Sequence, residues 1–196
     1  AGLETIESNY DVILLDFPPS LGYFAMNGIF ASDSLIIPIP PDMLDFSSAA
    51  AFFSQLADVS NMLDAKESER IEYNFVKLLM TKSPIANASV DIKTLMSKAE
   101  GPKERGNRQA KKIKALMLAA FGENLLKGEI VLSEAYKEAS SNFKSIFELD
   151  ATNMTCARST LKRALESTRS AHDEIEQLIQ VAMSQKIDQL EQSGDE

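Results

Sequence analysis

The sequence predicts an α/β fold in which a mostly parallel sheet lies between two layers of helices. Three short apolar runs have the length of strands, at residues 10–16, 34–40 and 72–81, and helical patterns separate them. A continuous apolar run bounded by turn residues is typical of a strand that is buried on both faces, as in parallel sheets. Strands that alternate with helices form right-handed βαβ units, so we expect a three-layer sandwich.

The first run ends in Asp16 and is followed by prolines, and we expect residues 12–16 to form the central strand. Residues 23–31 are apolar at helical spacing, and residues 34–40 form the second strand, which prolines close. These two strands and the helix between them make one βαβ unit. Ligands of open α/β sheets bind outside the carboxyl ends of the strands, here near Asp16 and Pro40.

The later elements follow from caps, breakers and periodicity. Asp45 or Ser47 is expected to cap a helix at residues 47–64, and the third strand at 72–81 lies beside the central one. In chain order the sequence then predicts a helix at 89–98, a loop at 99–107, a helix at 108–121 ended by Gly122, an edge strand at 125–132, and a long amphipathic helix at 155–192, broken at most once. We expect residues 1–192 to form one domain and residues 193–196 to fray.

Composition bounds the class of protein. The 196 residues are 44% hydrophobic and 25% charged, as in ordinary globular domains. No apolar run approaches the roughly 20 residues that cross a bilayer, and the first residues carry no export signal. The single cysteine, Cys156, has no cysteine partner. We therefore expect a cytoplasmic protein with no membrane partner.

Positive charge is concentrated in one segment of an acidic chain. The net charge is −9, yet residues 102–114 contain six basic residues and one acid. Such asymmetry favours contact with a polyanion such as DNA through phosphates, without sequence readout. A solvated loop and helix face is the alternative, and the long C-terminal helix offers a second basic group in Arg158, Lys162 and Arg163. The six basic residues are Lys103, Arg105, Arg108, Lys111, Lys112 and Lys114.

An acid at the carboxyl end of a buried strand is where nucleotide-hydrolysing α/β proteins hold Mg²⁺, usually through water. Asp16 fits that position, although many strand-end acids only cap the following turn. The segment Y-D-V-I-L-L-D-F-P-P-S-L-G at residues 10–22 resembles the Walker B segment of ParA/MinD-type partition ATPases, and M-L-D at residues 43–45 favours the A proteins of repABC plasmids. K-L-L-M-T-K at residues 77–82 and the pair Glu138-Ala139 resemble later family segments, so the resemblance covers nearly the whole chain.

The resemblance implies a P-loop NTPase-like fold and a nucleotide switch. Family members bind ATP and Mg²⁺, form ATP-dependent homodimers, bind DNA without sequence preference, and respond to a ParB/RepB-like centromere-binding protein. In that scheme Asp16 orients Mg²⁺ through water, and the nucleotide side carries Pro18, Pro19, Pro41, Asp42, Thr81 and Lys82.

One family motif has no counterpart in this sequence. The glycine-rich loop K-G-G-x-G-K-[ST] cradles phosphates with backbone amides, and no G-K-[ST] triplet occurs here. We therefore expect a fold incomplete at its N-terminus, with no complete catalytic site and no nucleotide bound by this chain alone. The alternative is a non-catalytic DNA-binding or partner-binding module derived from the family.

Overall fold

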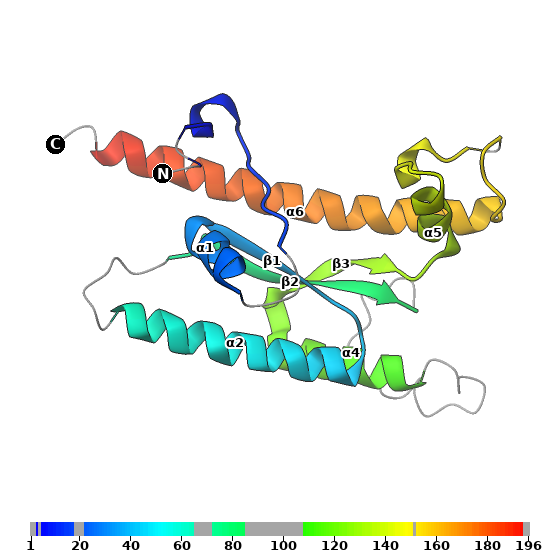
Figure 1. The fold of residues 1–196 in the computed structure, drawn as a ribbon, viewed down its shortest axis with the longest axis horizontal. Coiled ribbons are helices and arrows are strands. Elements are labelled where there is room, and N and C mark those ends of the chain that lie inside the picture. Colours follow the sequence, from blue (N-terminus) through cyan, green and yellow to red (C-terminus); the bar gives the residue numbers. More distant parts are fainter. Residues whose placement is uncertain are drawn as a thin grey trace.

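The computed structural model describes residues 3, 5–17, 22–64, 72–84, 108–150 and 152–193. Three parallel strands form one sheet in the order β1-β2-β3: β1 (Ser34–Ile39), β2 (Phe75–Ser83) and β3 (Leu125–Val131). Helix α6 (Arg158–Ser193) covers one side of the sheet, and α2 (Met43–Asp64) and α4 (Arg108–Phe121) cover the other (Figure 1). The predicted three-layer α/β fold with a parallel sheet is confirmed.

The predicted central strand is wrong. Residues 11–17 have no strand assignment, and β2 lies in the middle of the sheet. The segment alternates as an extended chain does, because Ile13, Leu15 and Phe17 are half-buried while Leu14 is 85% exposed. Apolar sequence favours extended backbone, but a strand also needs a neighbour with matching hydrogen-bond groups. Within the described residues β1 pairs only with β2, so no ladder includes this run.

In the first half of the chain, α1, β1 and α2 lie close to their predicted ranges. Helix α1 covers the predicted range, Tyr23–Ala31, and β1 follows it after a short turn. Helix α2 begins four residues before the predicted start, because its cap is Asp42 and neither Asp45 nor Ser47. The Asp42 side chain accepts the Leu44 N–H at 2.9 Å, and its carbonyl accepts the Phe46 N–H. A short polar side chain before the first turn satisfies such orphan donors.

The second half of the chain also matches the prediction in most elements. Helix α4 covers the predicted range, and Gly122 ends it with a φ of +51°, a conformation that favours glycine. Helix α6 runs unbroken for 36 residues, about 54 Å at 1.5 Å per residue. The sequence did not predict α5 (Glu134–Ser141), whose first turn Ser133 caps. The predicted helix at 89–98 and loop at 99–107 lie outside the described residues.

Three short 3-10 turns, η1 (Glu7–Asn9), η2 (Gly122–Asn124) and η3 (Ile146–Glu148), complete the described elements. Two clusters of buried side chains hold the layers together. The larger one joins β1, β2 and the start of β3 to α2 and α4, around Ile39, Leu78 and Met117. The smaller one joins α5 and η3 to the first turns of α6, around Ala135 and Ala164. Burial of apolar surface in these clusters fixes α5 beside the carboxyl end of β3.

Candidate functional site

The carboxyl ends of β1 and β2 meet at one edge of the sheet. These strands are parallel and stay in register from Ser34 opposite Phe75 to Ile39 opposite Met80. Residues 40–42 follow the end of β1, and residues 81–82 of β2 extend just past that end, so the two segments lie at one edge. The structure brings Pro41 and Asp42 to the same edge as Thr81 and Lys82, which is where open α/β sheets bind ligands.

Lys82 is the exposed cation of this edge. Its φ of +50° places it in the left-handed region, which is uncommon for a residue with a side chain. The pairing of β2 with β3 shifts register between Met80 and Ser83, so the backbone is irregular at this point. Ser83 is buried while Lys82 is exposed. The irregular strand end thus presents an ammonium group at the carboxyl edge. The Asp42 carboxylate is already used in capping α2.

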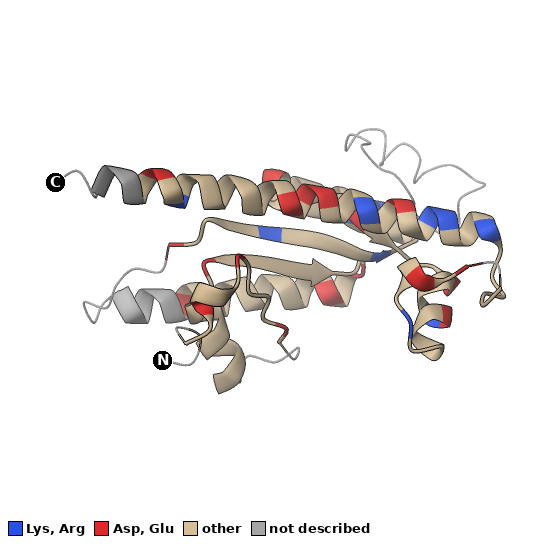
Figure 2. Ribbon diagram, turned by 90° about the horizontal axis from the view of Figure 1, so that it is seen from above, with Lys and Arg blue, Asp and Glu red and all other residues tan. Residues whose placement is uncertain are grey.

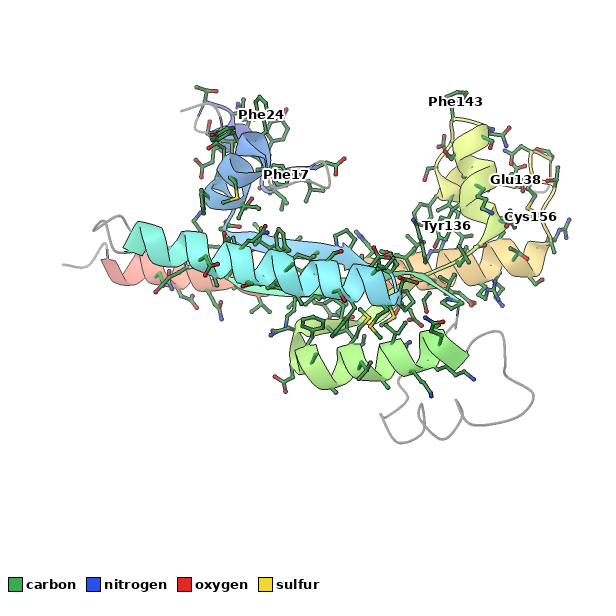
Figure 3. The ribbon with its side chains drawn as sticks, turned by 60° about the horizontal axis from the view of Figure 1, so that its bottom comes forward. Phe17, Phe24, Tyr136, Glu138, Phe143 and Cys156 are labelled. Atoms are coloured by element: carbon green, nitrogen blue, oxygen red, sulfur yellow. The ribbon has the colours of Figure 1, made fainter. Side chains whose placement is uncertain are left out.

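Asp16 directly precedes a residue that packs on α1. The next residue, Phe17, packs against α1 so closely that a Cβ on Gly28 would meet its ring at 1.9 Å. Figure 3 shows Phe17 beside α1, at the opposite end of the molecule from Glu138 on α5. Asp16 itself is exposed, and Pro18 and Pro19 lie outside the described residues. The assignment of Mg²⁺ to Asp16 remains a prediction.

The predicted basic segment does not form a continuous exposed surface. Lys103 and Arg105 lie outside the described residues, and the side chain of Arg108, the first residue of α4, is not described either. Lys112 is exposed, whereas Lys111 and Lys114 are only 5% and 4% exposed.

The rotation of α4 about its axis explains why Lys111 and Lys114 are buried. Residues three and four apart lie on one helical face, and the face that carries Ile113 and Met117 also turns Lys114 toward the sheet. Nζ of Lys114 lies 2.8 Å from Oε2 of Glu129 on β3. Both side chains are nearly buried, so this cation is neutralised inside the protein. A contact of Lys111 or Lys114 with DNA would need a different arrangement of α4.

Exposed cations gather instead on the first turns of α6. Figure 2 shows basic residues at this end of the helix, close to α5. Lys and Arg are unfavourable near a helix N-terminus because the helix dipole is positive there. The helix dipole therefore does not account for a cation in the first turn. The group consists of Arg158, Lys162, Arg163 and Arg169, all exposed, with Lys162 in a loose 3.8 Å ion pair with Glu166. The first three were a second candidate in the sequence but Arg169 was not, and its guanidinium lies over the ring of Phe147, 5.9 Å from its centroid.

Glu138 joins α5 to the loop that leads into α6. Its carboxylate accepts the backbone N–H groups of Thr155 and, at 2.9 Å, Cys156. The hydrogen bond from Thr155 and then that from Cys156 stabilise the ionised form, which lowers the pKa of Glu138 from 4.5 to about 2. The hydroxyl of Tyr136 also contacts α6, at the Ala164 carbonyl and the Thr168 hydroxyl. The sequence marked Glu138 only through a family resemblance, since no periodicity signals a contact with a loop 17 residues away.

Two kinds of feature are absent from the described residues. No group of three or more His, Cys, Asp or Glu side chains in this part of the chain is arranged to hold a metal ion. No helix that the structure describes is long and apolar enough to cross a membrane.

Comparison with known proteins identifies the family. A family model described as "AAA domain" matches residues 1–73. The "Putative replication protein A" of Rhizobium rhizogenes is 31% identical over 182 residues, which cover 92% of this chain and 39% of that protein. The protein of the same name from Sinorhizobium fredii is 27% identical and covers 94% of this chain and 40% of its own length. Protein SopA of Escherichia coli (strain K12) is 38% identical over 87 residues, or 44% of this chain and 21% of SopA.

Together with the parallel α/β fold, these matches show that the chain belongs to the ParA/MinD-type family of partition ATPases. The chain spans about two fifths of the length of its first two relatives, 39% and 40%.

Proposed function

We propose that the protein of which this chain forms a part is an ATP-dependent DNA-segregation switch of plasmid or chromosome partitioning. The supporting observation is the similarity to replication protein A relatives along 92% of the chain, in a family of partition ATPases. ATP and Mg²⁺ supply the chemistry of the switch, because hydrolysis changes the charge and contacts at the phosphates. The proposal concerns the whole protein.

The carboxyl edge is the proposed nucleotide side. Lys82 fits an anionic ligand, because it is an exposed cation held at the strand end by an irregular backbone. Pro41 and Thr81 flank it through the register of β1 and β2. In the whole protein Asp16 would hold Mg²⁺ through water, and Pro18 and Pro19 would shape the adjoining loop. This chain has no G-K-[ST] triplet, so a phosphate cradle of the family type has to come from residues outside it.

DNA is the proposed second ligand, and a ParB/RepB-like centromere-binding protein is the proposed partner. The exposed cations at the start of α6 can contact phosphates directly, while Lys111 and Lys114 are buried. Phosphate contacts hold a protein on DNA without reading its sequence, which suits a protein that must bind any part of a chromosome. ATP-dependent self-association would double the number of such contacts.

The test uses the whole protein purified with its phosphate-binding loop. We expect retention of random duplex DNA that requires ATP, and hydrolysis that the cognate centromere-binding protein stimulates. DNA retention of equal strength with and without ATP, in the absence of hydrolysis, would instead support the non-catalytic DNA-binding module. Absence of DNA retention under both conditions would refute both functions.

A further inference from the structure

The outer side of β3 is a strand edge with no neighbouring strand in the described sheet. The N–H groups of Lys127 and Val131 and the carbonyl of Glu129 face α6 rather than β2, since side chains of α6 bind them. Unpaired groups of this kind are a template for another strand, so native proteins cover or block them. Here the side chains of α6 cover these groups.

Ser167 of α6 takes the place of one peptide group of a missing strand. Its hydroxyl accepts the Val131 N–H at 2.9 Å and donates to the Glu129 carbonyl. A neighbouring strand would satisfy these two groups with one carbonyl and one N–H. A single hydroxyl does both, because it is at once a donor and an acceptor.

Glu174, two turns further along α6, covers the other end of the edge. Its Oε1 accepts the Lys127 N–H at 3.1 Å, and its Oε2 accepts the Gly128 N–H at 2.7 Å. Consecutive N–H groups of a regular strand point in opposite directions, but the register of β3 shifts between its pairs with Leu78 and Met80. A departure of this kind from the regular ladder lets two consecutive donors face one carboxylate.

Gly128 allows the helix to come this close. A Cβ at this position would lie 2.6 Å from Cα of Ala171 and 2.8 Å from its backbone nitrogen. The backbones of β3 and α6 are therefore in direct contact. Apolar packing alone would hold α6 on the face of the sheet, but it would leave the edge donors unpaired. The hydrogen bonds of Ser167 and Glu174 satisfy these edge donors in addition to that packing.

We propose that Ser167 and Glu174 form a seal on the β3 edge that keeps a second copy of this chain from pairing its own β3 there. A second copy is the occupant that the groups fit, because two identical edges can pair antiparallel about a two-fold axis, each supplying the donors that the other accepts. This inference does not depend on nucleotide or DNA.

The first experiment opens the seal in the chain as it stands. Glu174→Ala should speed amide hydrogen exchange at Lys127 and Gly128 by at least tenfold and produce concentration-dependent association in sedimentation velocity. The matched control is Glu176→Ala on the same helix, since Glu176 is exposed and its side chain contacts only His172 and Gln180 among the described interactions. The control should exchange and sediment like the wild type.

A second variant separates edge pairing from general unfolding. Adding Lys127→Pro to Glu174→Ala removes one of the two outward donors, and the proline ring disfavours a strand pairing at the edge. The double variant should return to the sedimentation of the wild type. Association that survives the proline, or faster exchange in Glu174→Ala without any association, would overturn the proposal.

Ser167 gives an independent test through its chemistry. Ser167→Thr keeps the hydroxyl and should sediment like the wild type, while Ser167→Ala loses both bonds and should associate more strongly than the wild type. Equal behaviour of the two variants would show that the hydroxyl does not protect the edge. These measurements contain no ATP or DNA, so their outcome is separate from that of the proposed function.

Discussion

Nζ of Lys114 on α4 lies 2.8 Å from Oε2 of Glu129 on β3, and the two side chains are 5% and 8% exposed. Oε1 of the same carboxylate is buried and has no hydrogen-bond partner among the described residues. The ammonium of Lys114 is therefore the main compensation for a carboxylate that has left water. This pair also joins the helix layer of α4 to the strand that α6 covers on its other face.

Removing one partner of this pair should be costly. Lys114→Ala leaves the buried Glu129 carboxyl without its partner, so we expect the free energy of unfolding to fall by about 3–5 kcal/mol in urea denaturation. Lys112→Ala, an exposed neighbour, should change it by no more than about 0.5 kcal/mol. Replacing both partners, as Lys114→Met with Glu129→Leu, should recover most of the loss. Equal losses of stability in Lys114→Ala and Lys112→Ala would contradict a buried ion pair.

The Glu138 contact predicts a dependence of stability on pH. Its folded pKa is about 2, below the ordinary 4.5, so the carboxylate contributes stability that is present above pH 4.5 and is lost as pH falls toward 2. The Tm of the wild type should fall as the pH decreases over that range. Glu138→Gln should lack this part of the pH dependence. Glu134→Gln, an exposed residue on the same helix, is the control and should keep it. Identical pH profiles for the wild type and Glu138→Gln would refute the contact.

Two glycines should respond to alanine for different reasons. Gly128→Ala forces a Cβ against the backbone of Ala171, where no side chain can move aside, so we expect a loss of at least about 1–3 kcal/mol. Gly122→Ala meets nothing within 4 Å, and its cost of about 1–2 kcal/mol comes from the positive φ alone. Hydrogen exchange distinguishes them, since only Gly128→Ala should expose the amides that face α6.

The proposed DNA surface predicts which cations change the salt dependence of binding. In the whole protein with ATP, neutralising Lys162 and Arg163 should flatten the slope of log affinity against log salt by about 2. Lys111→Ala with Lys112→Ala should flatten it by no more than about 1, because only Lys112 is exposed. Preference among random sequences should stay unchanged. A change of about 2 for the α4 pair and none for the α6 pair would return the DNA contact to α4.

The proposed metal role of Asp16 is tested by hydrolysis in the same protein. Asp16→Ala should abolish ATP hydrolysis while the urea midpoint stays close to that of the wild type, because the side chain is exposed and outside the described apolar clusters. Wild-type hydrolysis rates in this variant would leave Asp16 as an exposed acid with no metal to orient.

Much of the candidate site follows from local pattern. The prolines that close the run at residues 34–40 and the apolar stretch at 72–81 predict two strand ends, and parallel pairing then brings Pro41 and Lys82 to the same edge. Local pattern cannot supply a pairing partner. The run at 12–16 has the same composition as the other strands, yet it belongs to no ladder in the described residues.

The sequence by itself determined the alternation of strands and helices, the range of α4, and the family, because apolar periodicity, caps and motif letters are properties of neighbouring residues. Only the tertiary structure decided which side of α4 faces the sheet, and hence that Lys114 is buried against Glu129 while Lys112 is exposed. It also decided that α6 covers the β3 edge through Ser167 and Glu174. These contacts join residues 15 to 47 positions apart, and their geometry depends on how packed layers settle against one another rather than on any local preference.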